Sequence, residues 1–240
     1  MSPYLESILI QSGVNILLAL SFYVPRSVGL LALGQHAFMA IGAYTLAILT
    51  TRYEVPFHLA VLTAGAMAAG VGVVTGLAAL RLKGLYLAIL TLAFGEITAV
   101  FFVNWDFAGG AEGIYAIPTE TNLWVLYGFI GFFCFLLYRF STSRSGRAWQ
   151  AVRDNEDVAE AFGVHLFREK TIAYGLGAFL AGVAGAFFAG YMNYIEPHLF
   201  SFGRMIDICV FVVFGGVDIF WGPVMGALAL TLIPESARFL

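Results

Sequence analysis

The chain has 240 residues, of which 60% are hydrophobic and only 11% are charged, and its formal net charge is −3. A water-soluble core of this size cannot hide so much apolar surface, and the charge balance does not indicate a nucleic-acid partner. A helix needs about 20 apolar residues to cross about 30 Å of hydrocarbon. The composition therefore predicts an all-α, polytopic integral membrane protein, embedded in a lipid bilayer as one domain over residues 1–240.

Seven or eight apolar stretches follow one another along the chain, each long enough to be interpreted as a transmembrane helix. They cover residues 5–24, 28–50, 56–80, 84–103, 122–140, 170–193, 205–217 and 221–239. Glycines and a proline between residues 215 and 223 interrupt the last two, which predicts two helices with a tight turn or one broken helix. The first stretch lacks a basic n-region and a cleavage site, so we expect it to be retained in the mature chain.

Basic residues fall in alternate loops, which predicts the orientation of the chain. The basic loops contain Arg26, then Arg81 and Lys83, and then Arg139, Arg144, Arg147, Arg153, Arg168 and Lys170. The loops between them are acidic or neutral and contain Glu54, then Asp106, Glu112 and Glu120, and then Glu196. The positive-inside rule therefore places the basic loops in the cytoplasm, and the acidic loops and the N-terminus outside.

The most informative polar segment covers residues 141–169 and lies between two apolar stretches. Six of its residues recur at helical spacing, namely Ala148, Ala151, Val152, Asn155, Ala159 and Phe162. Ser145 is a candidate N-cap, and Gly163 lies where a helix often ends with positive φ. We predict one or two short amphipathic helices outside the bilayer, which either rest on the membrane surface or dock into another protein. No GxxxxGK[ST] phosphate-binding loop occurs, so this chain is expected to bind no cofactor, and any ATP hydrolysis requires a separate subunit.

Five separated blocks carry a resemblance to a known family. They are LALGQHAFMAIGAYT (31–45), LRLKGLYLAILTLAFGEI (80–97), AGGAEGI (108–114), SRSGRAWQAVRDNEDVAEAFGV (143–164) and VVFGGVDIFWGPVMGA (212–227). In this order they resemble the inner-membrane permeases of branched-chain amino acid ABC importers, specifically the LivM type. Members usually continue further past PESARFL, so the chain is expected to be a short or a truncated form.

The resemblance implies both a function and a set of partners. The chain would be a multi-pass permease of the inner (plasma) membrane that moves branched-chain amino acids, or a similar small solute such as urea or an amide. It would pair with a second, LivH-like permease, two ABC ATPase subunits that bind ATP, and a periplasmic substrate-binding protein.

The polar segment resembles the coupling helix by which such permeases contact their ATPase. Residues 160–163 look like a degenerate EAA-type signature with its following glycine. The resemblance therefore implies an ATPase-docking role for residues 147–163, carried by Arg147, Arg153, Asn155, Glu160, Ala161, Phe162 and Gly163. A rigid, locally ordered element of this kind suits the transmission of a two-state movement.

Three ionisable residues lie inside apolar stretches, where a charge costs about 2.5–3.5 kcal/mol on insertion scales. His36, Glu96 and Asp207 are therefore candidate residues of a solute pathway. Each also has a structural interpretation: a packed histidine, a helix-to-helix hydrogen bond of Glu96 to Thr91, Thr98 or a partner helix, and an ion pair of Asp207 with Arg204.

Three other classes of protein remain alternatives, one of which, a structural scaffold, would not require polar residues at Glu96 and Asp207. An ion-coupled secondary transporter would have no evident use for the cytoplasmic amphipathic segment. A membrane-embedded enzyme is disfavoured because HExxH, GxSxG and catalytic dyads are absent. Cys134 and Cys209 lie in apolar stretches without metal-ligand spacing, so we expect buried free thiols and no metal site.

Overall fold

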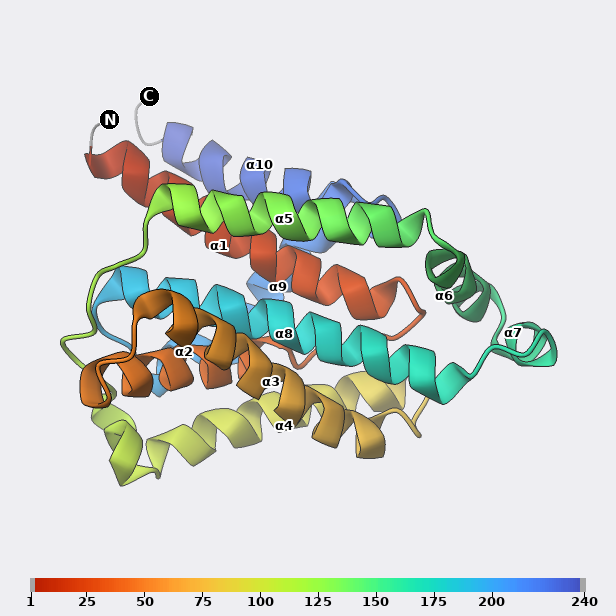
Figure 1. Cartoon of the computed structure of the whole chain (residues 1–240), viewed down its shortest axis with the longest axis horizontal. Helices are drawn as coiled ribbons and strands as arrows, with labels where there is room; N and C mark the ends of the chain where they lie inside the picture. The colour runs from red at the N-terminus through yellow and green to blue at the C-terminus, as the bar shows by residue number, and fades with distance from the viewer. Residues whose placement is uncertain (1–2, 238–240) are drawn as a thin grey trace.

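The computed structural model describes residues 3–237, which fold into a bundle of α helices (Figure 1). The helices along the bundle are α1 (Pro3–Arg26), α2 (Gln35–Arg52), α3 (Phe57–Ala79), α4 (Leu85–Val103), α5 (Leu123–Ser141), α8 (Leu166–Met192), α9 (Phe202–Gly215) and α10 (Gly222–Ala237). Between them lie α6 (Arg144–Asp154), α7 (Glu156–Ala161), and the 3-10 turns η1 (Asp106–Ala108), η2 (Gly110–Glu112) and η3 (Pro197–Phe200). Within residues 3–237 the β structure is an isolated bridge between Ile114 and Ile195. The all-α prediction is confirmed.

Within residues 3–237, six helical stretches are long and apolar enough to cross a membrane. They are Tyr4–Arg26, Phe57–Ala79, Leu85–Val103, Leu123–Ser141, Leu166–Met192 and Pro197–Gly215, the last of which combines η3 with α9. Helices α2 and α10 run beside them, so the bundle helices correspond to the eight predicted stretches. The multi-pass prediction is confirmed. The break near residue 215 separates two helices, because Gly216 ends α9 with φ +100°.

The predicted helix over residues 28–50 is wrong at its start, because α2 begins only at Gln35. Residues 30–34 are not helical, and they follow Gly29, whose φ is +85°. The backbone N–H of Leu33 donates to the Thr91 hydroxyl of α4 at 2.9 Å. Thr91 lies about 9 Å along α4 from its first residue, at 1.5 Å per residue. Helix α2 therefore begins inside the bundle, where neighbouring helices satisfy its irregular approach.

Helix α8 is the centre of the bundle and packs against α1, α2 and α3 (Figure 1). Most of its residues between positions 173 and 190 are buried. Helices α2 and α8 approach so closely that a methyl group at Gly42 would overlap the carbonyl oxygen of Gly182. Small residues thus allow backbone contact between helices, as expected where no hydrophobic effect drives association.

The two ends of the bundle carry different loops. Contacts of Lys83 with Glu156 and of Arg153 with Asp218 place the α3–α4 and α9–α10 turns at the α6–α7 end. At the other end, Arg52 donates to the backbone oxygen of Phe107, so the α2–α3 turn lies beside the loop after α4. Helix α1 also begins at that end (Figure 1). The alternation of loops agrees with the predicted separation of basic and acidic loops.

Candidate functional site

The predicted polar segment forms two short helices at one end of the bundle (Figure 1). Helix α6 is capped by the Ser143 side chain, which accepts from the Gly146 N–H at 3.2 Å, so the prediction of Ser145 as the cap is wrong. Asn155 caps α7 by accepting from the N–H groups of Asp157 and Val158. Gly163 follows α7 with φ +84°, as predicted. We call residues 141–169 the cytoplasmic segment, after the side of the membrane that the positive-inside rule predicts for it.

The buried face of this segment differs from the predicted apolar stripe. Trp149 is 3% exposed, its ring lies 4.4 Å from that of Phe140, and its indole N–H donates to Glu169 at 2.8 Å. Val152 and Ala159 of the predicted stripe are also buried, but Ala151, Asn155 and Phe162 are exposed. The large indole, and not the alanine row, therefore fixes α6 to the start of α8.

An ion pair fixes α7 to the same helix. The Lys170 ammonium lies 2.7 Å from the Glu156 carboxylate, and Lys83 lies 3.5 Å from the same oxygen. The Lys170 side chain is 8% exposed and that of Glu156 is 30% exposed. Burial alone would raise the pKa of Glu156, but the two lysines together hold that pKa below its ordinary value. Glu156 is therefore charged at neutral pH and joins α7 to both α8 and the α3–α4 turn.

The predicted ATPase-docking residues divide into two groups. Five of them are exposed at the free surface of the segment: Arg147, Glu160, Ala161, Phe162 and Gly163. Phe162 is 85% exposed and Val158 is 50% exposed, which leaves an apolar end on α7 without cover. The other two have contacts inside the chain, because Asn155 caps α7 and Arg153 lies 3.2 Å from Asp218.

The structure brings two of the predicted pathway residues together. The His36 Nε2 atom lies 3.8 Å from a Glu96 carboxylate oxygen, although the residues are far apart in sequence. His36 is fully buried at the start of α2, and neither ring nitrogen has a hydrogen-bond partner among the described residues. The Gln35 side chain is equally buried and unpartnered.

The depth of this pair follows from its place on α4. His36 packs against Gly95, which lies about 15 Å from the first residue of α4. That is near the middle of a hydrocarbon layer about 30 Å thick. The Glu96 side chain is 47% exposed, but its Oε1 atom, which faces His36, is buried and has no hydrogen-bond partner among the described residues. A carboxylate at this depth needs a protein partner or a polar path beside it.

Asp207 lies elsewhere and has a different environment. Its carboxylate is 3.9 Å from the Arg204 guanidinium, one helical turn away, as the structural interpretation predicted. Arg204 also donates to Asn15 of α1 at 3.3 Å, and Asn15 donates to Thr231 of α10 at 3.0 Å. Arg204 therefore links α9 to α1, and Asp207 belongs to this network rather than to the His36–Glu96 pair.

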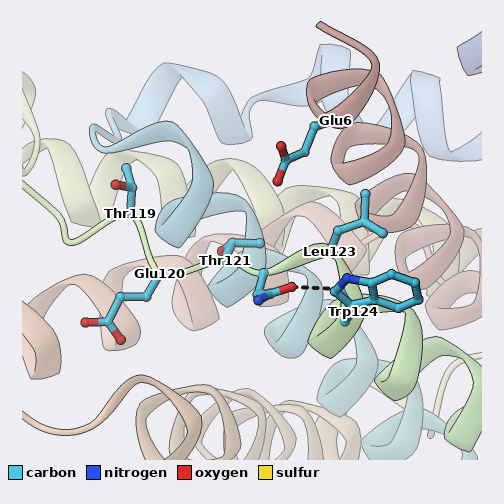
Figure 2. Close-up of a pocket in the computed structure, with 7 residues that line it drawn as sticks. Glu6, Thr119, Glu120, Thr121, Leu123 and Trp124 are labelled. Carbon is cyan, nitrogen blue, oxygen red and sulfur yellow. Dashed lines mark hydrogen bonds between the residues drawn. The ribbon is translucent and has the colours of Figure 1, made fainter. Parts of the chain in front are cut away.

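A hollow of about 510 Å³ opens at the opposite end of the bundle from α6 and α7. Figure 2 shows Glu6 of α1 above Thr121, which belongs to the non-helical stretch that leads into α5. The Asn122 side chain accepts from the Trp124 backbone N–H at 2.9 Å and so starts that helix. The lining side chains contain two carboxylates and two hydroxyls, without a histidine or cysteine to form a catalytic pair. Among the side chains of residues 4–233, no group of three metal-ligating residues occurs.

Sequence reasoning missed several residues that hold the segment in place, namely Trp149, Glu156, Glu169, Lys170 and Asp218. A tryptophan within an otherwise polar, charged segment is a usable signal, because so large an apolar surface is seldom left exposed. The ionic partners carry no comparable signal, since opposite charges are common throughout the segment.

Taken together, apolar helices, two mid-membrane polar residues and an anchored polar segment at one end define a multi-pass membrane protein of the transport-subunit type. The chain belongs to the family described as "Branched-chain amino acid transport system / permease component", which matches residues 4–240.

Several curated proteins are similar to the chain. It is 32% identical over 266 residues to the high-affinity branched-chain amino acid transport system permease protein LivM of Escherichia coli (strain K12), with 96% of this chain and 61% of that protein covered. The protein of the same name from Salmonella typhimurium is 31% identical, with the same coverage. The probable branched-chain amino acid transport permease protein LivH of Methanocaldococcus jannaschii is 26% identical over 253 residues, with 92% and 76% covered. The chain thus spans about three fifths of the LivM proteins it matches, and no solved structure gives a significant match.

Proposed function

We propose that this chain is a permease subunit of an ATP-binding-cassette importer in the inner (plasma) membrane. Its solutes would be branched-chain amino acids or similar small molecules such as urea or an amide. Its partners would be a second, LivH-like permease, two ABC ATPase subunits and a periplasmic substrate-binding protein. The chain would contribute a path and no catalysis, with ATP bound and hydrolysed by the partner subunits.

One structural observation supports this proposal in addition to the family membership. The cytoplasmic segment is fixed to α8 by the Trp149–Glu169 hydrogen bond and the Glu156–Lys170 ion pair, yet it leaves Phe162 almost wholly uncovered. An ordered element with an exposed aromatic residue at its tip suits insertion into a pocket of a partner, where such residues dominate binding. A helix that merely rested on lipid would have no need of a rigid attachment to the bundle core.

Co-purification from native membranes tests this proposal. We expect the tagged chain to bring down a P-loop ATPase and a second permease, and a Phe162→Asp variant to lose the ATPase. The matched Phe162→Leu variant keeps an apolar side chain and should retain it. Since Phe162 is 85% exposed, neither substitution should affect insertion or folding. Recovery of the chain without an ATPase, or equal recovery with both variants, would count against the proposal.

An ion-coupled secondary transporter stays the second candidate, because the His36–Glu96 pair supplies one observation in its favour. Ionisable residues at mid-membrane depth are typical of proton relays in such carriers. Uptake that collapses with a protonophore while ATP is held constant would favour this second candidate. Uptake that depends on ATP and survives the protonophore would favour the importer.

A further inference from the structure

The turn between α9 and α10, residues 216–221, rests against the cytoplasmic segment. Arg153 of α6 donates through Nη1 to the Asp218 carboxylate at 3.2 Å. The Arg153 side chain is 28% exposed, and its backbone lies directly beside Gly29 of the α1–α2 turn. Arg153 is therefore turned toward the bundle, away from the free surface that Phe162 and Glu160 occupy.

Aromatic contacts also hold the α9–α10 turn in place. The Phe220 ring meets Tyr23 of α1 at 6.0 Å and Tyr138 of α5 at 5.8 Å, both nearly edge to face. A cavity of about 80 Å³ lies beside it, lined by residues of α1, α5, α6 and the turn itself. The turn is thus held by one ion pair and one ring, with free space next to them.

The cytoplasmic segment and the α9–α10 hairpin, which meet at the Arg153–Asp218 contact, are rigid in different ways. The cytoplasmic segment is locked to α8 by Trp149 and Glu156, as described above. Helices α9 and α10 pack backbone to backbone, because a methyl group at Gly226 would overlap the carbonyl oxygen of Phe211. A displacement of the cytoplasmic segment would therefore move the α9–α10 hairpin as one rigid unit. The Arg153–Asp218 contact and Phe220 lie between the segment and the hairpin. Helix α9 carries the Arg204–Asp207 pair.

We infer that Arg153 is a positioning residue that acts inside the permease. With Asp218 and Phe220 it passes a movement of the cytoplasmic segment to the α9–α10 hairpin, and it does not contact the ATPase. This inference rests on the proposed importer function, and it separates Arg153 from the other residues for which the family resemblance implies a docking role. The contact is partly exposed, so its loss weakens transmission without unfolding the protein.

A double-mutant cycle on the reconstituted complex tests the inference. The variants are Arg153→Gln, Asp218→Asn and the two combined, and the readouts are ATPase co-purification and solute uptake per ATP hydrolysed. We expect each single variant to lower uptake per ATP by roughly two- to five-fold, the range that corresponds to an exposed ion pair. The combined variant should be no worse than either single one, because both remove the same contact. Co-purification of the ATPase should be unchanged in all three.

Arg144→Gln is the matched control, because Arg144 is an exposed arginine on the same helix and lies outside the predicted docking residues 147–163. It should leave uptake per ATP unchanged in the complexes that form. A Phe220→Ala variant should lower uptake per ATP without any change of charge. Loss of the ATPase from Arg153→Gln would show that Arg153 is a docking residue and overturn the inference, as would strictly additive effects or unchanged coupling. Absence of an ATPase from the wild-type preparation would instead contradict the proposed function itself.

Discussion

The contact between His36 and Gly95 leads to a prediction that can be worked through from the structure. A methyl group built at Gly95 would overlap the Nε2 and Cε1 atoms of His36, well inside the 3.0 Å that real Cβ atoms keep from other atoms. The ring is fully buried, so it has no solvent-filled space to move into. Gly95→Ala must therefore push α4 away from the start of α2.

The expected cost combines two opposing effects. Overpacking of a closed site costs about 1–3 kcal/mol, while alanine in place of glycine inside a helix gains up to about 1 kcal/mol. The net destabilisation should be about 0–2 kcal/mol, and the variant should be about 1–3 kcal/mol less stable than a Gly131→Ala control, which has the same helix gain without the clash. At about 2–4 °C per kcal/mol for a chain of this size, its unfolding midpoint should lie about 2–12 °C below that of the control. Gly131→Ala, on the exposed side of α5 with nothing within 4 Å, should not lower the midpoint.

A thiol-reactive dye can follow this unfolding in detergent. In a Cys209→Ser background the remaining thiol is Cys134, which is 8% exposed and becomes reactive as the bundle opens. Removal of the ring should relieve the clash, so the Gly95→Ala/His36→Ala double variant should be at least as stable as His36→Ala alone. The reasoning is refuted if Gly95→Ala behaves like the Gly131→Ala control, or if removal of the ring brings no relief.

Three further predictions concern the cytoplasmic end and the membrane interior. Gly84 precedes α4 with φ +57° and ψ −126°, a backbone conformation that alanine adopts only with strain, so Gly84→Ala should destabilise the protein by about 1–3 kcal/mol. The cost comes from the backbone alone, because nothing lies within 4 Å of the position of an added Cβ, and an unchanged unfolding midpoint would contradict this. Glu156→Gln leaves the buried Lys170 ammonium without its anion, and should lower stability by about 2 kcal/mol and expose the α7–α8 junction to protease at neutral pH. The folded pKa of Glu156 lies below its ordinary value, so the stability that the ion pair contributes is present above about pH 4.3 and is lost as the pH falls through the folded pKa. A stability difference between Glu156→Gln and wild type that persists in acid would be evidence against the ion pair. Glu96→Gln should lower solute uptake several-fold with the amount of folded protein unchanged, whereas a loss of folded protein with normal specific uptake would assign Glu96 to packing.

The sequence was sufficient to predict the long helices and which of their ends lie together, because these features depend on local properties. Apolar length places each long helix, and the alternation of basic and acidic loops orders their ends. The start of α2 was not predictable in the same way. Residues 28–50 are apolar throughout, and what delays the helix to Gln35 is a turn at Gly29 and a hydrogen bond to Thr91, which is distant in sequence.

The candidate sites likewise combine features that local sequence predicts with features that depend on the packing of distant helices. Gly163 could be predicted at the end of a short helix, because a helix often ends at a glycine with positive φ. Helical spacing placed Phe162 in the apolar stripe of that helix, but its side chain is 85% exposed. The pairing of His36 with Glu96, and that of Arg153 with Asp218, depends on which helices lie side by side. A single sequence carries no such information, so the resemblance implies for Arg153 the same docking role as for Phe162 and Glu160, which are more exposed in the fold.

The most direct test of the account is uptake into proteoliposomes that hold the purified complex. Leucine and its binding protein are supplied outside, and ATP with Mg²⁺ is enclosed inside. The account predicts leucine uptake that requires enclosed ATP, persists with a protonophore and is lost with Phe162→Asp but not with Phe162→Leu. Uptake that needs no ATP and follows an imposed ion gradient would contradict the assignment as an importer subunit.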